Sequence, residues 1–322
     1  MKILTNSWVL AFFCFATLSH APTAQAWGRH GHSLIGETAV YLATGEKGGE
    51  GFKSHAFDVG YYCNVPDFIW KRPATYETER SEHYMDVDVL DRLAERRPEI
   101  RSAVNLPRAE FDKQFPEFPT KAGRAWWRIR ELTERLQGFT KELQAAAKAE
   151  LTERHALQSK WLITAGVIGH YVGDLSMPLH VTENHDGQAT GQKGVHAFFE
   201  ETCVDDLFMH LQDTVYRKAK AAWPSFQKKN AKRSVQEMVE ELSRSSLDNI
   251  KELLAIDKRS QRQKVQEACH RFEPMILRRL VASSLVLGEI YRRHMNWDFN
   301  NDRFYVYVGE PEYIRPGEIT AK

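Results

Sequence analysis

The sequence predicts an all-α protein with a single domain, and three observations support this prediction. Apolar residues recur at helical spacing through most of the chain, strand-like alternation is confined to one segment, and no linker, repeat or low-complexity tract divides the chain. With 322 residues the chain is long enough to bury one large core or two smaller ones. We expect one domain over residues 27–322, preceded by a signal peptide at residues 1–26.

The first 26 residues have the pattern of a secretory signal peptide. Lys2 supplies a positive charge, WVLAFFCFATL is apolar but too short to span a bilayer, and Ala24-Gln25-Ala26 fits the small-x-small cleavage rule. Cleavage before Trp27 would leave the protein in the periplasm or the medium without a transmembrane anchor. An uncleaved anchor is the alternative, although the apolar stretch is short for one.

The composition argues against recognition driven by bulk charge and against a disulfide scaffold. Once Lys2 is removed, 43 of the 44 basic residues remain beside 43 acidic ones, so net charge does not steer the protein towards nucleic acid or an anionic membrane. The cysteines that remain are Cys63, Cys203 and Cys269, an odd and small number. They allow one bridge and one free thiol, and the sequence leaves the pair open.

Helical segments follow one another along the chain. The first is HSLIGETAVYLAT at 32–44, and residues 125–175 hold two helices with a break near Gly138 or in the 150s. The part from Trp161 to Leu175 is apolar almost all round, which is typical of a buried helix. Residues 234–255 and 273–295 each carry an amphipathic stripe. The one good strand signal is RFYVYVG at 303–309.

The strongest chemical signal is GHYVGDLSMPLH. His170 and Asp174 are spaced i,i+4, so they share one face of a helix and could grip one metal ion. The rest of this helix is apolar, and an unpaired carboxylate there would be costly, which favours a metal or a strong partner. Pro178 ends the helix and His180 follows it in the turn. The alternative is a structural His–Asp pair with an unrelated loop histidine.

Three further segments hold residues of the same kind. In GVHAFFEE, His196 and Glu200 are again spaced i,i+4, which is a weak signal alone and a second candidate site beside the first. Asp67 in NVPDFIW follows a proline, where an acid is often a helix cap. His83 in SEHYMDVD precedes Tyr84, and a surface histidine is the alternative.

Together these segments supply four histidines and three carboxylates. Zinc favours this mixture of nitrogen and oxygen ligands, and an exported enzyme does not easily keep thiolate sites reduced. Catalytic zinc retains an open position for water, and several zincs close together stabilise the oxygens of a phosphodiester. The residues alone therefore suggest a multinuclear zinc hydrolase of phosphate esters.

The set as a whole resembles the superfamily of bacterial zinc-dependent phospholipases C and single-strand-specific zinc nucleases. Its motif His-Tyr-x-Gly-Asp-x-x-x-Pro-x-His is matched in full by HYVGDLSMPLH, and the matching residues run from 27 to 200 in the family's order. The resemblance implies an all-α fold with three zinc ions. It also implies that the mature chain begins at tryptophan, whose free α-amine and carbonyl bind a zinc.

Carried over to this chain, the resemblance implies three ligand sets. One zinc would be held by Asp67, His83, His170 and Asp174. A second would be held by the amine and carbonyl of Trp27, by His32 and by Asp174, which bridges the two ions. The third would be held by His180, His196 and Glu200. The resemblance also implies a water between the bridged ions as nucleophile, with Asp67 able to orient or deprotonate it.

The resemblance leaves two branches open. WGRHGH has the short tryptophan-to-histidine spacing of the nucleases, whereas Glu200, the short segment from His180 to His196 and GYYCNVPDF are similar to the phospholipases. The chain also lacks the nuclease motif Trp-Ala-Asp around Asp67, the Gly-Gly-Asn element and the Asn-Leu-His…Trp-Asp ending. We favour cleavage of phospholipids. A nuclease and 3′-nucleotidase acting on single-stranded nucleic acid is the alternative, and a non-catalytic zinc-binding exported protein is the third interpretation.

The sequence also predicts substrate contacts and an insert near the cleft. We expect Tyr84 and Phe198 to contact substrate, whereas most of the nearby aromatics are expected in the core. The segment 90–124 lengthens the spacing between His83 and His170 beyond that of either branch, and we expect it to reshape the rim of the cleft. A solvated loop and helix is the ordinary alternative for such an Arg-, Glu- and Pro-rich run.

Overall fold

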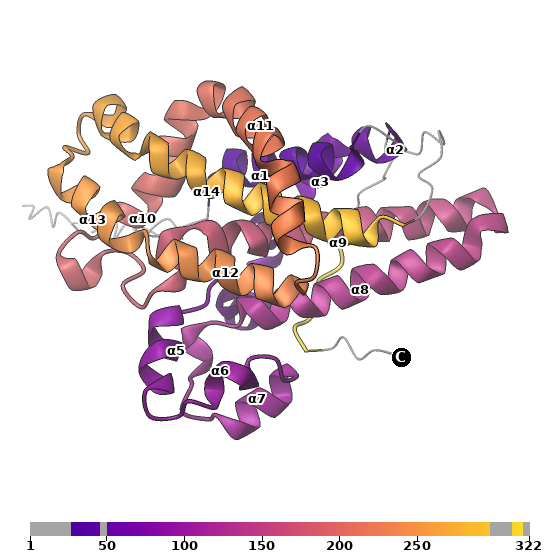
Figure 1. The fold of residues 1–322 in the computed structure, drawn as a ribbon, viewed down its shortest axis with the longest axis horizontal. Helices are drawn as coiled ribbons and strands as arrows, with labels where there is room; N and C mark the ends of the chain where they lie inside the picture. The colour runs from indigo at the N-terminus through magenta and orange to yellow at the C-terminus, as the bar shows by residue number, and fades with distance from the viewer. Residues whose placement is uncertain (1–26, 46–49, 297–310, 318–322) are drawn as a thin grey trace, which may run out of the picture.

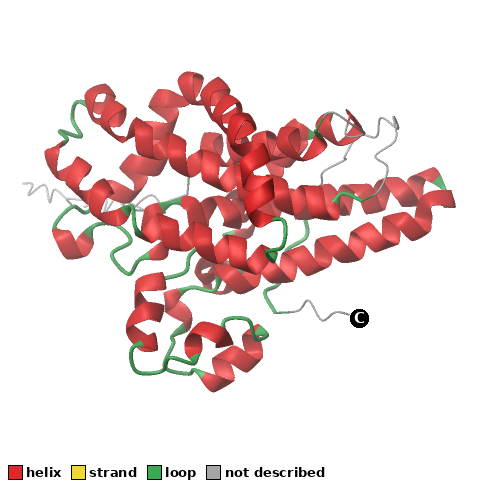
Figure 2. Cartoon of the chain, in the orientation of Figure 1, coloured by secondary structure: helices red, strands yellow, loops and turns green. Residues whose placement is uncertain are grey.

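The computed structural model describes residues 27–45, 50–296 and 311–317, and every regular element within those ranges is helical (Figure 2). The prediction of an all-α fold is therefore confirmed for this part of the chain. The predicted signal peptide at 1–26 and the predicted strand at 303–309 lie outside the described residues. Extended pairing within them is limited to one isolated bridge between Met85 and Gly123.

The α-helices differ widely in length. In chain order they are α1 (Gly28–Thr44), α2 (Glu50–Lys53), α3 (Ala56–Tyr62), α4 (Tyr76–Glu79), α5 (Val87–Ala94), α6 (Ile100–Ala103), α7 (Arg108–Gln114), α8 (Ala125–Ala145), α9 (Leu151–Ser176), α10 (Val195–Ala197), α11 (Cys203–Asn230), α12 (Val235–Leu247), α13 (Ile250–Arg259) and α14 (Val265–His294). Shorter turns of 3₁₀ or π geometry lie between them: η1 (Pro66–Trp70), η2 (Arg80–His83), η3 (Thr120–Ala122), η4 (Ala146–Lys148), η5 (Pro178–Val181), η6 (Gln188–Thr190) and η7 (Phe198–Thr202).

Helix α9 lies at the centre of the described structure. It packs against α3, α8, α12 and α14, and α1 packs against α3, α11 and α14 (Figure 1). From Trp161 to Leu175 nearly all of its side chains are buried, as predicted from their apolar character. Gly166 permits the close approach of α3, because a Cβ there would lie 2.2 Å from the Cβ of Tyr62. This packing places the second half of α9 inside the protein.

The predicted helix boundaries are confirmed in part. The segment predicted at 32–44 is helical but begins at Gly28, and the stripe at 234–255 is divided between α12 and α13. The break in 125–175 lies at η4 and the residues up to Glu150, just before the second of the two predicted positions. Gly138 remains inside α8, since one glycine costs only about 1 kcal/mol and the flanking turns are packed.

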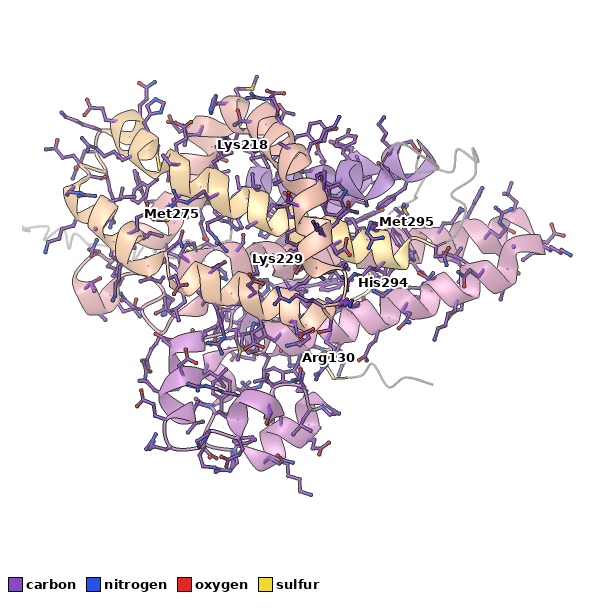
Figure 3. All side chains as sticks on the ribbon, viewed as in Figure 1. Arg130, Lys218, Lys229, Met275, His294 and Met295 are labelled. Atoms are coloured by element: carbon purple, nitrogen blue, oxygen red, sulfur yellow. A yellow bond between two sulfur atoms is a disulfide. The ribbon has the colours of Figure 1, made fainter. Side chains whose placement is uncertain are left out.

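The long helix α11 shows how the outer layer is built. Lys218 and Lys229 are exposed along it, whereas Leu207, Leu211 and Val215 are buried (Figure 3). Apolar residues therefore face the core and lysines face the solvent. Within the described residues, no helix is both long enough and apolar enough to cross a membrane.

The predicted insert 90–124 forms a small helical lobe that contains α6 and α7 (Figure 1). Its interior holds Phe111, Phe115 and Phe118, and Phe111 packs on Trp127 of α8 with ring centroids 4.5 Å apart. The guanidinium of Arg108 joins the lobe to the body by binding both Glu82 and Glu131. The insert is therefore a packed element.

A disulfide between Cys203 and Cys269 joins the start of α11 to α14. Cys63 is buried as a free thiol. The sequence allowed one bridge and one free thiol, and the structure selects the pair.

We expect removal of this disulfide by the double substitution C203A/C269A to destabilise the protein. The bridge closes a loop with a sequence separation of 66 residues, so its loss should cost about 2–5 kcal/mol and lower Tm by roughly 5–10 °C. Thermal unfolding followed by circular dichroism measures the change. An unchanged Tm under oxidising conditions would contradict this role.

Candidate metal centre

The structure brings together the eight predicted ligand side chains in two buried groups. The first, which we call the Asp174 group, contains His32 of α1, Asp67 of η1, His83 of η2, and His170 and Asp174 of α9. The second, the Glu200 group, contains His180 of η5, His196 of α10 and Glu200 of η7. Each of these residues is at most 7% exposed, although they come from seven elements.

Asp174 is the centre of its group. Its Oδ2 lies 3.0 Å from His83 Nδ1 and 3.4 Å from His170 Nε2, and its Oδ1 lies 3.3 Å from His32 Nε2. Asp67 Oδ1 lies farther away, 3.7 Å from His83 Nδ1 and 3.8 Å from His170 Nε2. One carboxylate therefore contacts three histidines with both oxygens, which is the arrangement that a bridging ligand requires.

The Glu200 group is smaller and its atoms are close together. The Nε2 atoms of His180 and His196 are 3.0 Å apart. Glu200 Oε2 lies 3.0 Å from His196 Nε2 and 3.6 Å from His180 Nε2. These are the three residues that the sequence resemblance implied for one metal ion.

Backbone carbonyls determine which ring nitrogens are free to bind a metal. The Nδ1 atoms of His170, His180 and His196 lie 2.7, 2.7 and 2.5 Å from carbonyl oxygens of residues 63, 83 and 185. A carbonyl accepts only, so each Nδ1 carries the proton and each neutral ring presents a lone pair at Nε2. Hydrogen bonds of this kind commonly orient histidine ligands to metals.

The donor set fits a bound cation. In the Glu200 group the two Nε2 atoms face each other beside a carboxylate, and two neutral rings in this arrangement would be unfavourable unless a cation lay between them. Several buried polar atoms of the centre have no hydrogen-bond partner among the described residues. They are both ring nitrogens of His32, both carboxylate oxygens of Glu200 and Oδ1 of Asp174. Ligand atoms within 4.8 Å of one another form three sets, two in the Asp174 group and one in the Glu200 group.

Two carboxylates of the centre lie in π-helical turns. Asp67 is in η1 and Glu200 is in η7, and turns of this kind often occur at functional sites. Asp67 makes no helix-capping hydrogen bond, so the interpretation as a cap does not hold here. Its Oδ1 instead accepts a hydrogen bond at 2.8 Å from the Nζ of Lys71, which lies four residues later in the chain.

Trp27 and Gly173 hold the start of α1 against α9. The indole Nε1 of Trp27 lies 2.8 Å from the carbonyl oxygen of Gly173 and 3.0 Å from Ser176 Oγ. A Cβ on Gly173 would lie 2.9 Å from His32 Nδ1, so only glycine lets this histidine approach. The Trp27 carbonyl accepts the Gly31 N–H and keeps a second lone pair. Coordination by the Trp27 α-amine stays a prediction, because residue 26 lies outside the described residues.

The electrostatics favour charged carboxylates beside a neutral His170. Burial alone would raise the pKa of Asp67, but the charge of Lys71, supported by that of His83, outweighs it and lowers that pKa. Burial lowers the pKa of His170 to about 3, so its ring is neutral near pH 7. Burial also lowers the pKa of His83, but hydrogen bonds with Asp174 and Glu79 reverse this and raise it to about 9.

The sequence reasoning missed a set of residues behind His83. Glu79 is fully buried, accepts a hydrogen bond from Tyr171, and lies 3.4 Å from His83 Nε2 and 3.7 Å from Arg128. Glu79 thereby favours a proton on Nε2 of His83 and turns its Nδ1 towards Asp174. The i,i+4 spacings of Glu79 to His83 and of Asp67 to Lys71 were the available signals.

A cavity of about 660 Å³ opens beside both groups. Its lining includes three ligand histidines, His83, His180 and His196. Cationic side chains lie in the lining as well, and so do carboxylates. The cations are Lys71, Arg80 and Lys121; the carboxylates are Asp86, Glu183 and Asp186. Pro119, Lys121 and Ala122 of the insert line it, in agreement with the expectation that the insert reshapes the rim.

The two predicted substrate contacts have different positions. Tyr84 lines the cavity, and its hydroxyl donates to the carbonyl of Lys121 at 3.1 Å. Phe198 is absent from the lining and packs against Phe272 and the guanidinium of Arg262. Phe198 therefore lies outside this cavity lining, and its contact with substrate stays a prediction.

Asp86 has an unusual environment in this cavity. The residue is 9% exposed, and its carboxylate makes no hydrogen bond or ion pair within the part of the chain that the structure describes, not even a cap of α5. Burial and the charges of Asp88 and Glu183 raise its pKa to about 7, although Arg92 opposes them. Ionising Asp86 is therefore costly in this environment.

We expect D86N to stabilise the metal-free protein, and the gain should increase with pH. In the folded state the Asp86 carboxyl keeps its proton up to about pH 7, whereas in the unfolded state it loses the proton near its ordinary pKa of 3.8. Wild-type stability therefore falls relative to the variant as the pH rises from about 4 to 7. Thermal unfolding in chelator at pH 5 and pH 8 measures the gain. D213N, at a side chain 79% exposed, is the control and should show no trend; an equal gain at both pH values would contradict the expectation.

Comparison with protein-family models, curated proteins and solved structures finds no match for this chain. The residues and their geometry provide two buried groups of side chains that could hold metal ions, beside a cavity that carries both positive and negative charge.

Proposed function

We propose that this protein is an exported zinc-dependent hydrolase of phosphodiesters, acting on phospholipids in the manner of a phospholipase C. The observation that carries this proposal is the convergence of eight buried candidate ligand side chains in two groups, with histidine ring nitrogens facing one another in each. Such a set is stable when it binds cations and costly when it does not. The nitrogen and oxygen ligands favour zinc.

We assign three zinc ions to these residues. The Asp174 group would hold two, with Asp174 as the shared ligand and Trp27 completing the second. The Glu200 group would hold the third. Zinc at these positions supplies Lewis-acid stabilisation of phosphate oxygens and activates water.

The chain's own residues would bind and orient the substrate. Asp67 is held ionised by Lys71, so it can accept the proton of an attacking water at a carboxylate oxygen. Lys71 is 13% exposed and lines the cavity, where its ammonium can also attract the anionic phosphate. Glu79 keeps His83 in the orientation that the centre requires.

The charges in the cavity favour a phospholipid headgroup over nucleic acid. A nucleic acid strand carries a negative charge at each phosphate, and its binding sites are strongly basic. Here the carboxylates of Asp86, Glu183 and Asp186 lie in the same lining as the cations. Those carboxylates would repel a polyanion.

Export is supported by the chemistry of the cysteines. Disulfides form and persist in oxidising compartments, and Cys203 and Cys269 are bridged. This observation agrees with the predicted signal peptide and with a periplasmic or secreted location.

One observation favours a second candidate. Tyr84 presents a half-buried ring in the cavity, and an aromatic ring can stack on a nucleobase. A single-strand-specific nuclease and 3′-nucleotidase of the same centre is therefore the alternative function. A non-catalytic zinc-binding protein would share the ligands but hydrolyse neither substrate.

We expect purified zinc-replete protein to release phosphorylated headgroup from phospholipid, and H170A to reduce this activity at least about 100-fold. H170A should also lose metal from the Asp174 group, and H196A should lose the zinc of the Glu200 group. Elemental analysis of metal per chain and headgroup release measure the two effects.

H270A is the matched control, because His270 is 58% exposed and lies in an ion pair with Glu273 away from the centre. It should retain metal and activity. Cleavage of single-stranded DNA or RNA without headgroup release would establish the nuclease alternative, and bound zinc without turnover of any substrate would leave the non-catalytic interpretation.

We expect a mature protein with one additional residue before Trp27 to lose one zinc and most of its activity. An α-amine has an ordinary pKa near 8 and binds zinc only when it is free and deprotonated. Metal content of the extended and authentic proteins measures the effect. Full metal content and full activity in the extended protein would exclude the Trp27 amine as a ligand.

A further inference from the structure

The buried carboxylate of Asp86 is a polar group in the cavity that the proposed reaction does not use. It is more than nine-tenths buried, lines the cavity and has no hydrogen-bond or ion-pair partner among the described residues. Its position at the start of α5 would ordinarily make it a helix cap, but it makes no capping hydrogen bond. A buried carboxylate without a donor is costly, so a ligand that brings a donor would be strongly favoured.

The backbone ties Asp86 to the metal-binding residues. The carbonyl of His83 lies 2.7 Å from His180 Nδ1, and the carbonyl of His180 accepts the Met85 N–H at 3.0 Å. On the other side, the Asp86 N–H donates to the carbonyl of Ala122 at 2.8 Å. The segment 83–86 is thus fixed beside His180, and Asp86 lines the same cavity as His83, His180 and His196.

The surroundings of Asp86 select the kind of cation. A quaternary ammonium has no N–H to donate and is ordinarily bound by a cage of aromatic rings. The cavity lining contains Tyr76 and Tyr84, and the guanidinium of Arg80 already lies 5.8 Å from the Tyr76 ring centroid. A primary ammonium has three N–H donors and forms charge-assisted hydrogen bonds with a carboxylate. Asp86 therefore suits a primary ammonium.

We infer that Asp86 is a specificity site for a primary ammonium group attached to the phosphate of the substrate, as in an ethanolamine phosphate headgroup. The phosphate half of this inference rests on the proposed function, because it places the phosphate at the metal centre. Lys71, Arg80 and Lys121 supply positive charge for the phosphate, and Asp86 supplies the negative charge for the ammonium.

The test is binding of three probes to the zinc-loaded full mature protein by calorimetry: phosphoethanolamine, phosphocholine and inorganic phosphate. We expect phosphoethanolamine to bind about tenfold or more tightly than phosphocholine. D86N should weaken phosphoethanolamine binding by about tenfold or more and leave inorganic phosphate within about twofold. D213N removes the same formal charge at a side chain that is 79% exposed and outside the cavity lining, and it should leave all three affinities within about twofold.

Two outcomes would overturn the inference: phosphocholine binding as tightly as phosphoethanolamine, or D86N weakening all three probes equally. The stability of D86N is checked by thermal unfolding, and D86E keeps the charge in case the amide variant does not fold. Hydrolysis assays separate this inference from the proposed function. Asp86-dependent binding of phosphoethanolamine without any phosphodiester hydrolysis would refute the function and keep the site, whereas hydrolysis with affinities that D86N does not change would refute the site alone.

Discussion

The structure depends on the carboxylate of Asp174, which lies on the largely apolar helix α9 in the interior of the protein. Asp174 is fully buried in α9, where burial opposes its charge, yet nearby histidines keep its pKa well below the ordinary value. Its two oxygens contact His32, His83 and His170, which come from three different helical segments. Because an isolated buried charge is strongly unfavourable, these contacts position α1 and η2 around α9. Gly173 and Trp27 provide the close fit on the α1 side.

The same logic extends outward in layers. Three backbone carbonyls orient His170, His180 and His196, and Glu79 holds His83, so that each ring presents its other nitrogen to the centre. Glu79 is itself held by Tyr171 and by the buried Arg128, whose guanidinium donates to the carbonyl of Ile314. The resulting arrangement could hold cations, and leaving its buried polar atoms without partners would be costly. The side chains of the candidate centre and the fold are therefore coupled energetically.

The cavity adds a division of charge to this centre. Cationic side chains and carboxylates, among them Asp86 without a protein partner, line the same cavity, and the insert contributes part of its wall. Such a cavity suits a small molecule with charges of both signs better than a polyanion. The fold can hold Asp86 without a partner because the backbone bonds of 83–86 to His180 and Ala122 fix its position independently of its side chain.

Much of the candidate centre was predictable from the sequence because its signals are local. The helices follow from apolar periodicity, and His170 with Asp174, or His196 with Glu200, share a face through i,i+4 spacing alone. Other features depend on contacts between residues far apart in the chain, which local spacing does not encode. The pairing of Cys203 with Cys269, the histidine tautomers and the inward turn of Phe198 belong to this class. The same holds for Asp86, which the sequence presents as an ordinary acid before a helix. Only packing reduces the exposure of Asp86 to 9% and leaves its carboxylate without a protein donor, because burial is a property of the assembled tertiary structure.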